Sequence, residues 1–277
     1  LRWRSFKNGS RTYVDAFQKH IVPHHRIHLN TTVTSIIRTQ NGVTLHFPNG
    51  NPRCYDHVVL AIHANQALRL LGGDATPLER RILSSFKTSD NVCYLHSDTS
   101  FLPSRFPARA AWNCFLETRN HAVEQGQHPS RCEVPQSSGR RISITFDMNK
   151  LQAIPFPGEP GSPGRVLVTM NPSRTPAMLQ GSYTYSHSLI SAQSVAMSRH
   201  LHKINGVDKI SYAGAWMGFG FHEDGYAAGA HAARIIMHGH ENTGALDLIH
   251  GTGQYSVGRV WIRMVGVTNE SFYHASD

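Results

Sequence analysis

The fold of this chain is decided by the stretch Ile210-Ser-Tyr-Ala-Gly-Ala-Trp-Met-Gly-Phe-Gly-Phe-His-Glu-Asp-Gly-Tyr-Ala-Ala-Gly-Ala-His-Ala-Ala-Arg-Ile-Ile236. Its first part, residues 210–216, is predicted to be a short buried strand with Ala and Gly where another backbone comes close. Residues 217–225 form a Gly-rich turn, and a helix is predicted from Tyr226 onward. Asp224 is the expected N-cap, because its carboxylate can accept hydrogen bonds from the amides of a first helical turn.

A strand, a Gly-rich turn and a helix in this order direct unpaired backbone amides and the positive end of a helix dipole at one point. Such a point favours an anion, or a group that becomes anionic during a reaction. The alternative is an ordinary strand–helix turn in the core, with no ligand. The length and order of the Gly, aromatic and acidic residues favour the binding interpretation.

The segment Gly214-Ala-Trp…Gly218-Phe-Gly-Phe-His-Glu-Asp-Gly225, followed by an Ala-rich helix, resembles the C-terminal flavin-binding motif of the FAD-dependent amine-oxidase-like oxidoreductases. Within that superfamily it is most similar to the branch of predicted NAD/FAD-binding proteins often linked to cyclopropane-fatty-acid synthesis. The resemblance implies that the helix start lies under the flavin ring, near N1 and the C2 carbonyl. Negative charge gathers there on reduction, so the dipole would favour the reduced anion.

Other segments match the same family in the expected order. Trp3-Arg4 and residues 9–14 match a segment near the start of the resemblance, which covers residues 1–239. Residues 31–36, around Val33, match a strand whose backbone contacts the adenine, and the strand ending at Ala61 matches one that lies near the cofactor.

The resemblance therefore implies FAD as the cofactor and a set of contact residues. Gly225 and Tyr226 would offer backbone amides to the flavin, while Glu223 or Asp224 would cap the helix or hold the ribityl hydroxyls. Trp216, Phe219 and His222 either line the ring pocket or pack in the core, and a structural role is preferred for His222. The catalytic base is unknown. The expected cofactor contacts are Val33, Ala61, Gly214, Ala215, Glu223, Asp224, Gly225 and Tyr226.

Composition argues against nucleic-acid binding, a metal site and a membrane span. The formal net charge is +9, but Lys and Arg are scattered, which ranks a nucleic-acid-binding module last. The 19 histidines are dispersed, so no metal site is expected, and no apolar run is long enough to span a bilayer. The four cysteines lack paired metal spacing, so we expect free buried thiols in a reducing, cytoplasmic compartment.

Local signals predict the remaining elements. A helix should run from Ser10 to Pro23 with one buried apolar face, and Asn41-Gly42 should turn a hairpin. Residues 76–79 form a capping box that opens a helix. Strands are expected at residues 26–29, 32–38, 56–61, 92–96, 110–115, 142–146 and 166–170, and further helices at residues 63–71 and 188–202.

The expected fold class is α/β (α+β), an incomplete FAD/NAD(P)-binding Rossmann-like domain with an inserted mixed-sheet substrate domain. The FAD domain should comprise residues 1–84 and 203–240, the substrate domain residues 85–202, and residues 241–277 are an unassigned tail. No strand–GxGxxG–helix unit occurs in the sequence, although dinucleotide binding usually starts with one. The simplest interpretation is an N-terminally truncated sequence.

The expected function is an FAD-dependent oxidoreductase that transfers a hydride from an amine or a lipid-like small molecule to flavin N5. As a fragment the chain is expected to be inactive and to hold little or no flavin, unlike a version extended upstream. The alternative is a non-catalytic remnant or scaffold that binds no cofactor. The substrate, the electron acceptor and the oligomeric state are not determined by the sequence.

Overall fold

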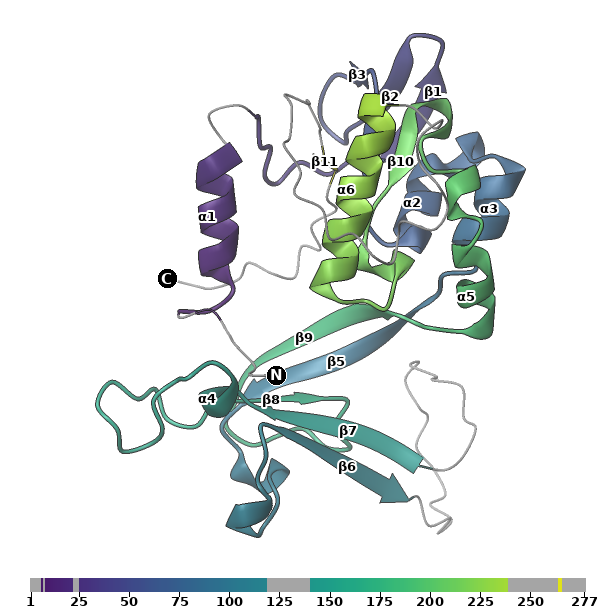
Figure 1. Ribbon diagram of the computed structural model, residues 1–277. Helices are drawn as coiled ribbons and strands as arrows, with labels where there is room; N and C mark the ends of the chain where they lie inside the picture. Colours follow the sequence, from purple (N-terminus) through teal and green to yellow (C-terminus); the bar gives the residue numbers. More distant parts are fainter. Residues whose placement is uncertain (1–5, 7, 22–24, 119–139, 239–263, 266–277) are drawn as a thin grey trace. The chain divides into compact units, whose positions relative to one another are not determined.

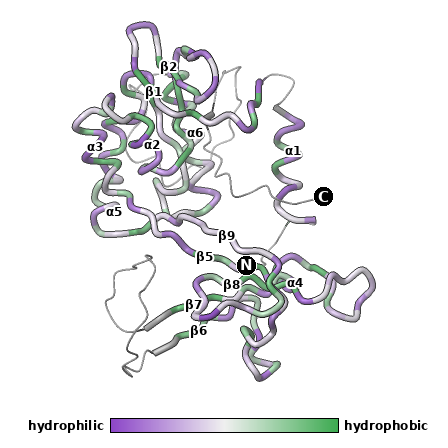
Figure 2. Tube along the Cα trace, turned by 180° about the vertical axis from the view of Figure 1, so that it is seen from behind, coloured by the Kyte–Doolittle hydropathy of each residue, from purple (hydrophilic) through white to green (hydrophobic). Residues whose placement is uncertain are grey.

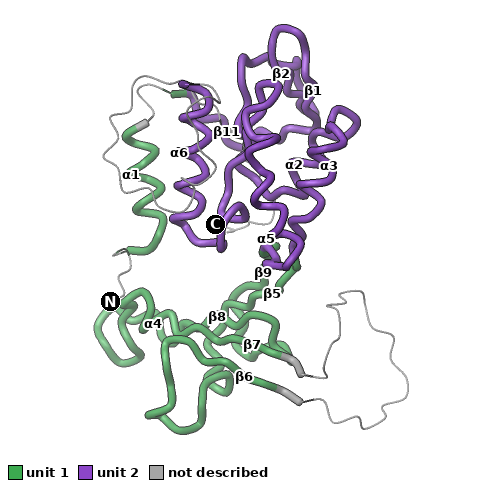
Figure 3. The backbone as a smooth tube through the Cα atoms, turned by 45° about the vertical axis from the view of Figure 1, so that its right-hand side comes forward, with its two compact units in different colours: residues 1–25, 89–187 green, residues 26–88, 188–277 purple. Residues whose placement is uncertain are grey.

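The computed structural model describes residues 6, 8–21, 25–118, 140–238 and 264–265 (Figure 1). The chain divides into two compact units, shown in Figure 3. Unit 1 comprises Leu1–His25 and Ser89–His187, and unit 2 comprises Arg26–Thr88 and Ser188–Asp277. Compared with the division expected from the sequence, residues 1–25 group with the inserted segment and residues 188–202 group with the rest of unit 2.

Unit 2 contains a sheet of order β1-β2-β3 and a sheet of order β10-β4-β11. The first is antiparallel, whereas β10 and β11 each pair parallel with β4. The tail therefore contributes one described strand, β11, beside β4. The elements are β1 (Ser35–Thr39), β2 (Gly42–His46), β3 (Arg53–Tyr55), β4 (Val58–Leu60), α2 (Ala64–Leu71), η1 (Gly72–Asp74), α3 (Pro77–Leu83), α5 (Ala192–Ser198), η4 (Leu201–Lys203), η5 (Val207–Lys209), β10 (Ile210–Tyr212), η6 (Ala215–Met217), α6 (His222–His238) and β11 (Met264–Val265).

The predicted hairpin is confirmed, with its turn one residue earlier than the Asn-Gly signal suggested. Thr39 pairs with Gly42, so Gln40 and Asn41 form the turn and Gly42 begins β2. A Cβ atom at Gly42 would overlap the backbone oxygen of Tyr55 in β3. Glycine is therefore required here for the close approach of the third strand rather than for the turn. The strand expected at residues 26–29 is wrong, because the sheet begins with β1.

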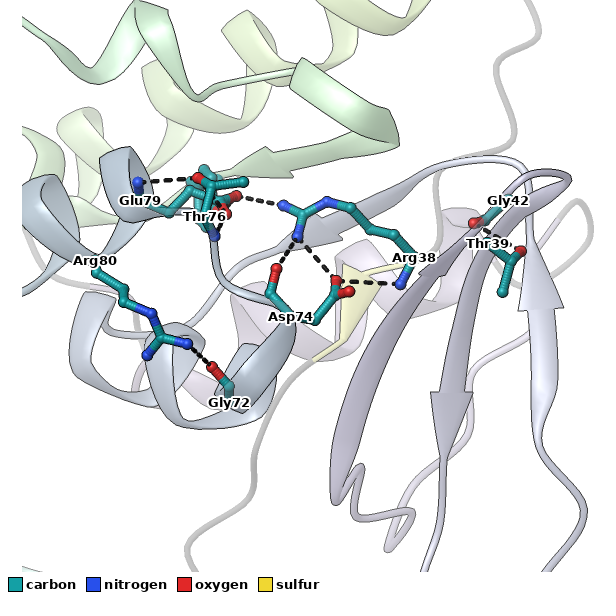
Figure 4. A network of polar contacts seen from close by, with 9 residues as sticks. Arg38, Thr39, Gly42, Gly72, Asp74, Thr76, Glu79 and Arg80 are labelled. Atoms are coloured by element: carbon teal, nitrogen blue, oxygen red, sulfur yellow. Dashed lines mark hydrogen bonds and ion pairs between the residues drawn. The ribbon is translucent and has the colours of Figure 1, made fainter.

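A buried polar network joins distant parts of unit 2 (Figure 4). The side chain of Glu79 is nearly inaccessible and accepts hydrogen bonds from the Arg38 guanidinium, from Tyr212 Oη at 2.6 Å and from the Thr76 amide at 2.8 Å. Thr76 Oγ1 in turn accepts from the Glu79 amide, which confirms the predicted capping box. Asp74 completes the network through an ion pair with Arg38 at 2.9 Å. Burial and the negative charge of Glu79 raise the pKa of Tyr212, which keeps the phenol a hydrogen-bond donor.

A second buried polar contact lies at the N-terminal ends of β4 and β10. His57 Nε2 is 2.8 Å from the hydroxyl oxygen of Ser211, whose side chain is inaccessible to solvent. Burial lowers the pKa of His57 below its ordinary value of 6.5. The imidazole is therefore neutral at physiological pH, and protonation would place a charge beside the buried hydroxyl.

Unit 1 is built on a five-stranded sheet of order β6-β7-β8-β5-β9. The β6–β7, β7–β8 and β8–β5 pairings are antiparallel, so these three pairings include none of the parallel pairs of the expected mixed sheet. The four predicted strands are confirmed, but β9 was missed, although Tyr183 and Tyr185 alternate within it. The elements are α1 (Arg11–Ile21), β5 (Thr88–His96), η2 (Thr99–Phe101), η3 (Phe106–Ala108), β6 (Trp112–Thr118), β7 (Arg140–Asp147), α4 (Met148–Leu151), β8 (Leu167–Met170) and β9 (Leu179–Ser188).

One face of this sheet is polar and buried. The hydroxyl of Thr169 is 2.8 Å from His96 Nε2 and 2.8 Å from the hydroxyl of Thr145, and all three side chains are inaccessible to solvent. Beside this row, buried Asp147 forms an ion pair with Arg165 at 2.7 Å. Buried polar groups require such partners, so the row fixes the register of three strands.

The opposite face of the same sheet is apolar and accessible. Trp112, Leu116 and Ile142 are 60%, 65% and 55% exposed within the described structure. Successive side chains along each strand alternate between the two faces of the sheet, so that polar side chains lie on the buried face and apolar side chains on the accessible face. An ordinary half-buried sheet has the opposite arrangement.

The buried face predicted for the first helix is wrong. Tyr13, Val14 and Phe17 form the expected apolar stripe on α1, and its alternation with polar residues can be followed in Figure 2. All three side chains are nevertheless about half exposed. Spacing places the side chains on one side of a helix, but it does not supply the surface that covers them.

Two sequence expectations concern cysteines and membrane spans. Cys54, Cys93 and Cys114 are free thiols, but only Cys93 is buried, so the expectation of buried thiols is wrong for the other two. Cys132 lies outside the described residues. None of the helices in the described part of the chain has the length and hydropathy needed to cross a bilayer.

We expect Glu79→Ala to lower the free energy of unfolding by about 3–5 kcal/mol, because it leaves the Arg38 charge without its buried partner. Arg81→Ala, an exposed change in the same helix, should alter it by less than about 0.5 kcal/mol. Urea denaturation of both variants measures the difference. Equal stability of the two variants would contradict the structural role of the network.

The lowered pKa of His57 predicts a stability loss in acid. The unfolded chain binds the proton more readily than the folded chain, so stability is complete above about pH 6.5 and falls as the pH drops through the folded pKa. His57→Gln keeps a polar partner for Ser211 and removes this contribution. The urea midpoint of each variant is measured at about pH 7.5 and about pH 5.5. The difference between the two midpoints should be smaller in His57→Gln than in the exposed control His238→Gln. An unchanged pH dependence in His57→Gln would be the contrary result.

Candidate cofactor site

The candidate site lies at the carboxyl ends of two parallel strands. Leu60 pairs with Tyr212, and the Ala213 amide donates to the Leu60 carbonyl at 3.1 Å. Ala61 therefore follows β4 beside the point where Gly214 follows β10. In parallel sheets the crevice outside the carboxyl ends is where ligands bind. The polypeptide leaves β10 through η6 and then enters α6 (Figure 1).

Trp216 connects the turn after β10 to the segment that follows β4. Its indole nitrogen donates to the Ile62 carbonyl at 2.8 Å, and its ring packs edge-on against Phe86 with centroids 4.7 Å apart. The side chain is only 6% exposed. Of the two interpretations for Trp216, core packing is therefore the observed one, and the indole fixes the turn to the end of β4.

Asp224 acts differently from the expected N-cap. Helix α6 starts at His222, so Asp224 lies within the first turn. Its Oδ2 atom accepts from the amides of Phe219 at 3.1 Å and Phe221 at 2.8 Å, both of which precede the helix. A Cβ atom at Gly218 would overlap this carboxylate. The carboxylate thus folds back over the turn, in the manner of the acidic residue of a capping box.

At the start of α6, the amides without a hydrogen-bond acceptor in the helix differ from those that the sequence predicted. The Gly225 amide donates to the Phe221 carbonyl at 3.2 Å, and Tyr226 lies one residue further along the helix. The expectation that these two residues present free amides is wrong, because the helix begins earlier than the sequence suggested. The amides without an intrahelical acceptor are those of residues 222–224. They coincide with the positive end of the dipole of a 17-residue helix.

Most of the expected contact residues lie together. The Cβ position of Gly225 is 3.7 Å from the backbone nitrogen of Ala215, and Ala61 packs with the buried Ala residues of α6. Val33 belongs to a different core cluster from Ala61, the larger one that contains Ile36 and Leu60. The other expected contact residues belong to the segments that follow β4 and β10 or to the first two turns of α6: Ala61, Gly214, Ala215, Glu223, Asp224, Gly225 and Tyr226.

Three exposed aromatic side chains surround the helix start. Phe219, Phe221 and Tyr226 are each about 70% exposed. Sequence reasoning named Phe219 only as an alternative to core packing and did not select Phe221. The alternation of Phe with Gly at residues 218–221 could have predicted this exposure, because few side chains in a Gly-rich turn can bury a large ring.

The residues fit one end of FAD better than the other. The amides of residues 222–224 suit the C2 carbonyl and N1 region of a flavin ring, and small Ala and Gly residues let a flat ring approach the backbone. The carboxylates of Glu223 and Asp224 can accept from ribityl hydroxyls, but they would repel a pyrophosphate. The arrangement therefore suits the ring and ribityl part of the cofactor.

Comparisons with known proteins identify the family of this chain. A family model described as flavin containing amine oxidoreductase matches residues 3–237. A crystal structure of a CLA-producing fatty acid isomerase from P. acnes is similar over 80% of this chain and 51% of that protein, with 13% identity and a TM-score of 0.50. No match was found among curated proteins.

Two further structures are more distant. A putative protoporphyrinogen oxidase from Exiguobacterium sp. 255-15 has a TM-score of 0.49 and 13% identity, over 84% of this chain and 52% of that one. Cyclohexylamine oxidase from Brevibacterium oxydans IH-35A has a TM-score of 0.41 and 14% identity, over 74% and 48%. The chain thus spans about half the length of the solved structures that it matches.

The position of Asp224 predicts a measurable contribution to stability. Asp224→Ala removes the acceptor for two turn amides and should lower the free energy of unfolding by about 0.5–2 kcal/mol. Glu223→Ala, an exposed change of the same charge in the same turn, should have a smaller effect. Chemical denaturation compares the two variants, and a larger loss in Glu223→Ala would refute the assigned role of Asp224.

Proposed function

Since the chain belongs to the flavin-containing amine oxidoreductase family, we propose that it supplies the flavin-ring end of an FAD-dependent oxidoreductase. The supporting observation is the start of α6, where the Cβ position of Gly225 lies 3.7 Å from the backbone nitrogen of Ala215, shortly after the carboxyl end of β10. When bound, FAD would accept a hydride at N5 from a substrate carbon.

The residues of this chain bind and orient in the proposed reaction. The first-turn amides and the dipole of α6 would hold the C2 carbonyl and favour negative charge at N1. Asp224 holds the turn in shape and, with Glu223, would accept hydrogen bonds from the ribityl chain. Ala61 and Ala215 would allow the ring to lie close to the backbone. Val33 remains a proposed contact to the adenine through its backbone.

Apolar groups near the site support an apolar substrate. Phe219, Phe221 and Tyr226 are each about 70% exposed at the helix start. We infer that the substrate is an amine or a lipid-like molecule whose apolar part is desolvated on binding. No general base is assigned, because hydride transfer to a flavin requires orientation and exclusion of water rather than a nucleophile.

Retention of FAD by the 277 residues alone should be weak. The sequence contains no strand–GxGxxG–helix unit, which usually holds the pyrophosphate. The proposal therefore concerns recognition of the flavin ring by residues 1–277, and it does not require these residues to hold the pyrophosphate. The competing function is a scaffold that binds no flavin.

Fluorescence titration of the purified 277-residue protein with FAD tests the proposal. We expect weak binding that requires added FAD and that changes the flavin fluorescence. If the protein binds no FAD, the scaffold function replaces the oxidoreductase function.

Charge reversal at the helix start gives a sharper test. Asp224→Lys removes the acceptor for the turn amides and places a positive charge at the positive end of the dipole, so FAD affinity should fall about tenfold, or roughly 1.4 kcal/mol. Asp56→Lys is the matched control, because this exposed residue precedes the opposite ends of the strands. Equal affinity in the two variants would remove Asp224 from the site.

A further inference from the structure

The sequence contains four Asn-Gly dipeptides, at residues 8–9, 41–42, 49–50 and 205–206. In such a dipeptide the backbone nitrogen of the glycine can attack the side-chain amide carbon of the asparagine, because glycine has no Cβ atom to obstruct the approach. The attack requires a glycine N–H that is free of hydrogen bonds and an asparagine side chain that can rotate towards it. The four dipeptides are alike in sequence, so differences in their reactivity come from the fold.

The fold blocks the reaction at Asn205. Its side chain is buried, and Oδ1 accepts a hydrogen bond from the Tyr212 amide at 2.8 Å. The Gly206 amide donates to the Ile210 carbonyl at 2.8 Å. Both reacting groups are therefore engaged, and freeing them would break hydrogen bonds in the protein interior.

The glycines of two other dipeptides are also held in place. Gly42 is buried at the start of β2, where it pairs with Thr39, and its carbonyl accepts from Thr39 Oγ1 at 3.1 Å. Because a Cβ atom at Gly42 would overlap the backbone oxygen of Tyr55, this glycine has little room to move. The Gly9 amide is engaged as well, since it donates to the Phe6 carbonyl at 3.0 Å. Attack at either position first requires the local structure to open.

The dipeptide Asn49-Gly50 lacks these restraints. It lies in the loop 47–52 that joins β2 to β3, and both residues are exposed. Within the described structure, neither the Asn49 side chain nor the Gly50 amide forms a hydrogen bond, and a Cβ atom at Gly50 would meet no neighbour within 4 Å. The pairing of the two strands ends at Leu45 and Arg53, so the loop can change its conformation without breaking the sheet.

We propose that Asn49 is a site of spontaneous deamidation, with water as the co-reactant. The Gly50 nitrogen bonds to the side-chain amide carbon of Asn49, the bond from that carbon to Nδ2 breaks, and ammonia leaves with the proton that the Gly50 nitrogen gave up. Water then opens the five-membered imide at either carbonyl, which leaves an aspartate or an isoaspartate at position 49. The two steps together exchange an amide for a carboxylate, and they consume no oxidant or reductant.

The reaction changes the charge and the backbone length of one loop. The new carboxylate lowers the formal net charge of +9 by one, and an isoaspartate adds one carbon atom to the main chain. Since the loop lies outside the pairing of β2 with β3, the modified protein should remain folded. The reaction requires no flavin, so it stands independently of the proposed oxidoreductase function.

Ageing of the purified 277-residue protein in a mildly alkaline buffer tests the proposal. Trypsin releases residues 39–53 as one peptide, because an arginine precedes each of the two cleavage points, and tandem mass spectrometry then reports the conversion of each asparagine within it. Asn49 should convert at least about tenfold faster than Asn41, since attack at Asn41 requires the β1–β2 pairing to open. Asn51 is the internal control, because the proline that follows it has no N–H.

Unfolding separates the effect of the fold from that of the sequence. In guanidinium chloride at a concentration that unfolds the protein, Asn41 and Asn49 should convert at similar rates. A preference for Asn49 that persists undiminished in the unfolded chain would overturn the proposal, because the fold would then not select the site.

Variants connect the charge change of the intact protein to Asn49. Cation-exchange chromatography of the folded protein measures how fast the acidic form accumulates. Asn49→Gln, whose longer side chain closes the imide ring far more slowly, should reduce this rate at least about tenfold, whereas the matched change Asn41→Gln should leave it unaltered. The proposal is also overturned by similar conversion of Asn41 and Asn49 in the folded protein, by no conversion at Asn49, or by an unreduced rate in Asn49→Gln.

Discussion

The buried carboxylate of Glu79 joins segments that are far apart in the sequence. It binds Arg38 of β1, Thr76 at the start of α3 and Tyr212 at the end of β10. Because the charge is buried, it is tolerated only while these partners remain in place. Tyr212 is the last residue of β10, and the turn that leads to α6 begins directly after it. The position of the candidate cofactor site therefore depends on an interaction that lies outside the site.

At the start of α6 the sequence places acidic and donor groups side by side. Asp224 accepts hydrogen bonds from the amides of Phe219 and Phe221, while the amides of residues 222–224 have no acceptor within the helix. The carboxylate of Asp224 thus interacts with the turn, whereas the dipole of α6 remains available to a ligand. This arrangement is compatible with a ring whose carbonyl accepts hydrogen bonds, and it disfavours a ligand with a full phosphate charge at the same point.

Local signals in the sequence predicted local structure well. The capping box at Thr76 and the hairpin before Gly42 are determined by a few neighbouring residues, so both are present as expected. The role of Asp224 could not be predicted, because it depends on how the Gly-rich turn folds back. The exposure of Tyr13 could not be predicted either, since the spacing of a helix does not identify its packing partner. Strand β9 could not be predicted either, because most of its residues are polar and the alternation of apolar side chains is weak.

The backbone amides of residues 222–224 offer the most direct measurement of the central claim. Nitrogen-15 NMR of the 277-residue protein, recorded with and without added FAD, reports whether a hydrogen-bond acceptor reaches each amide. The account predicts large shifts at these three amides and at Ala61, with little change at Glu79 in the same unit. Shifts confined to other parts of the chain would contradict it, because the cofactor would then lie away from the start of α6.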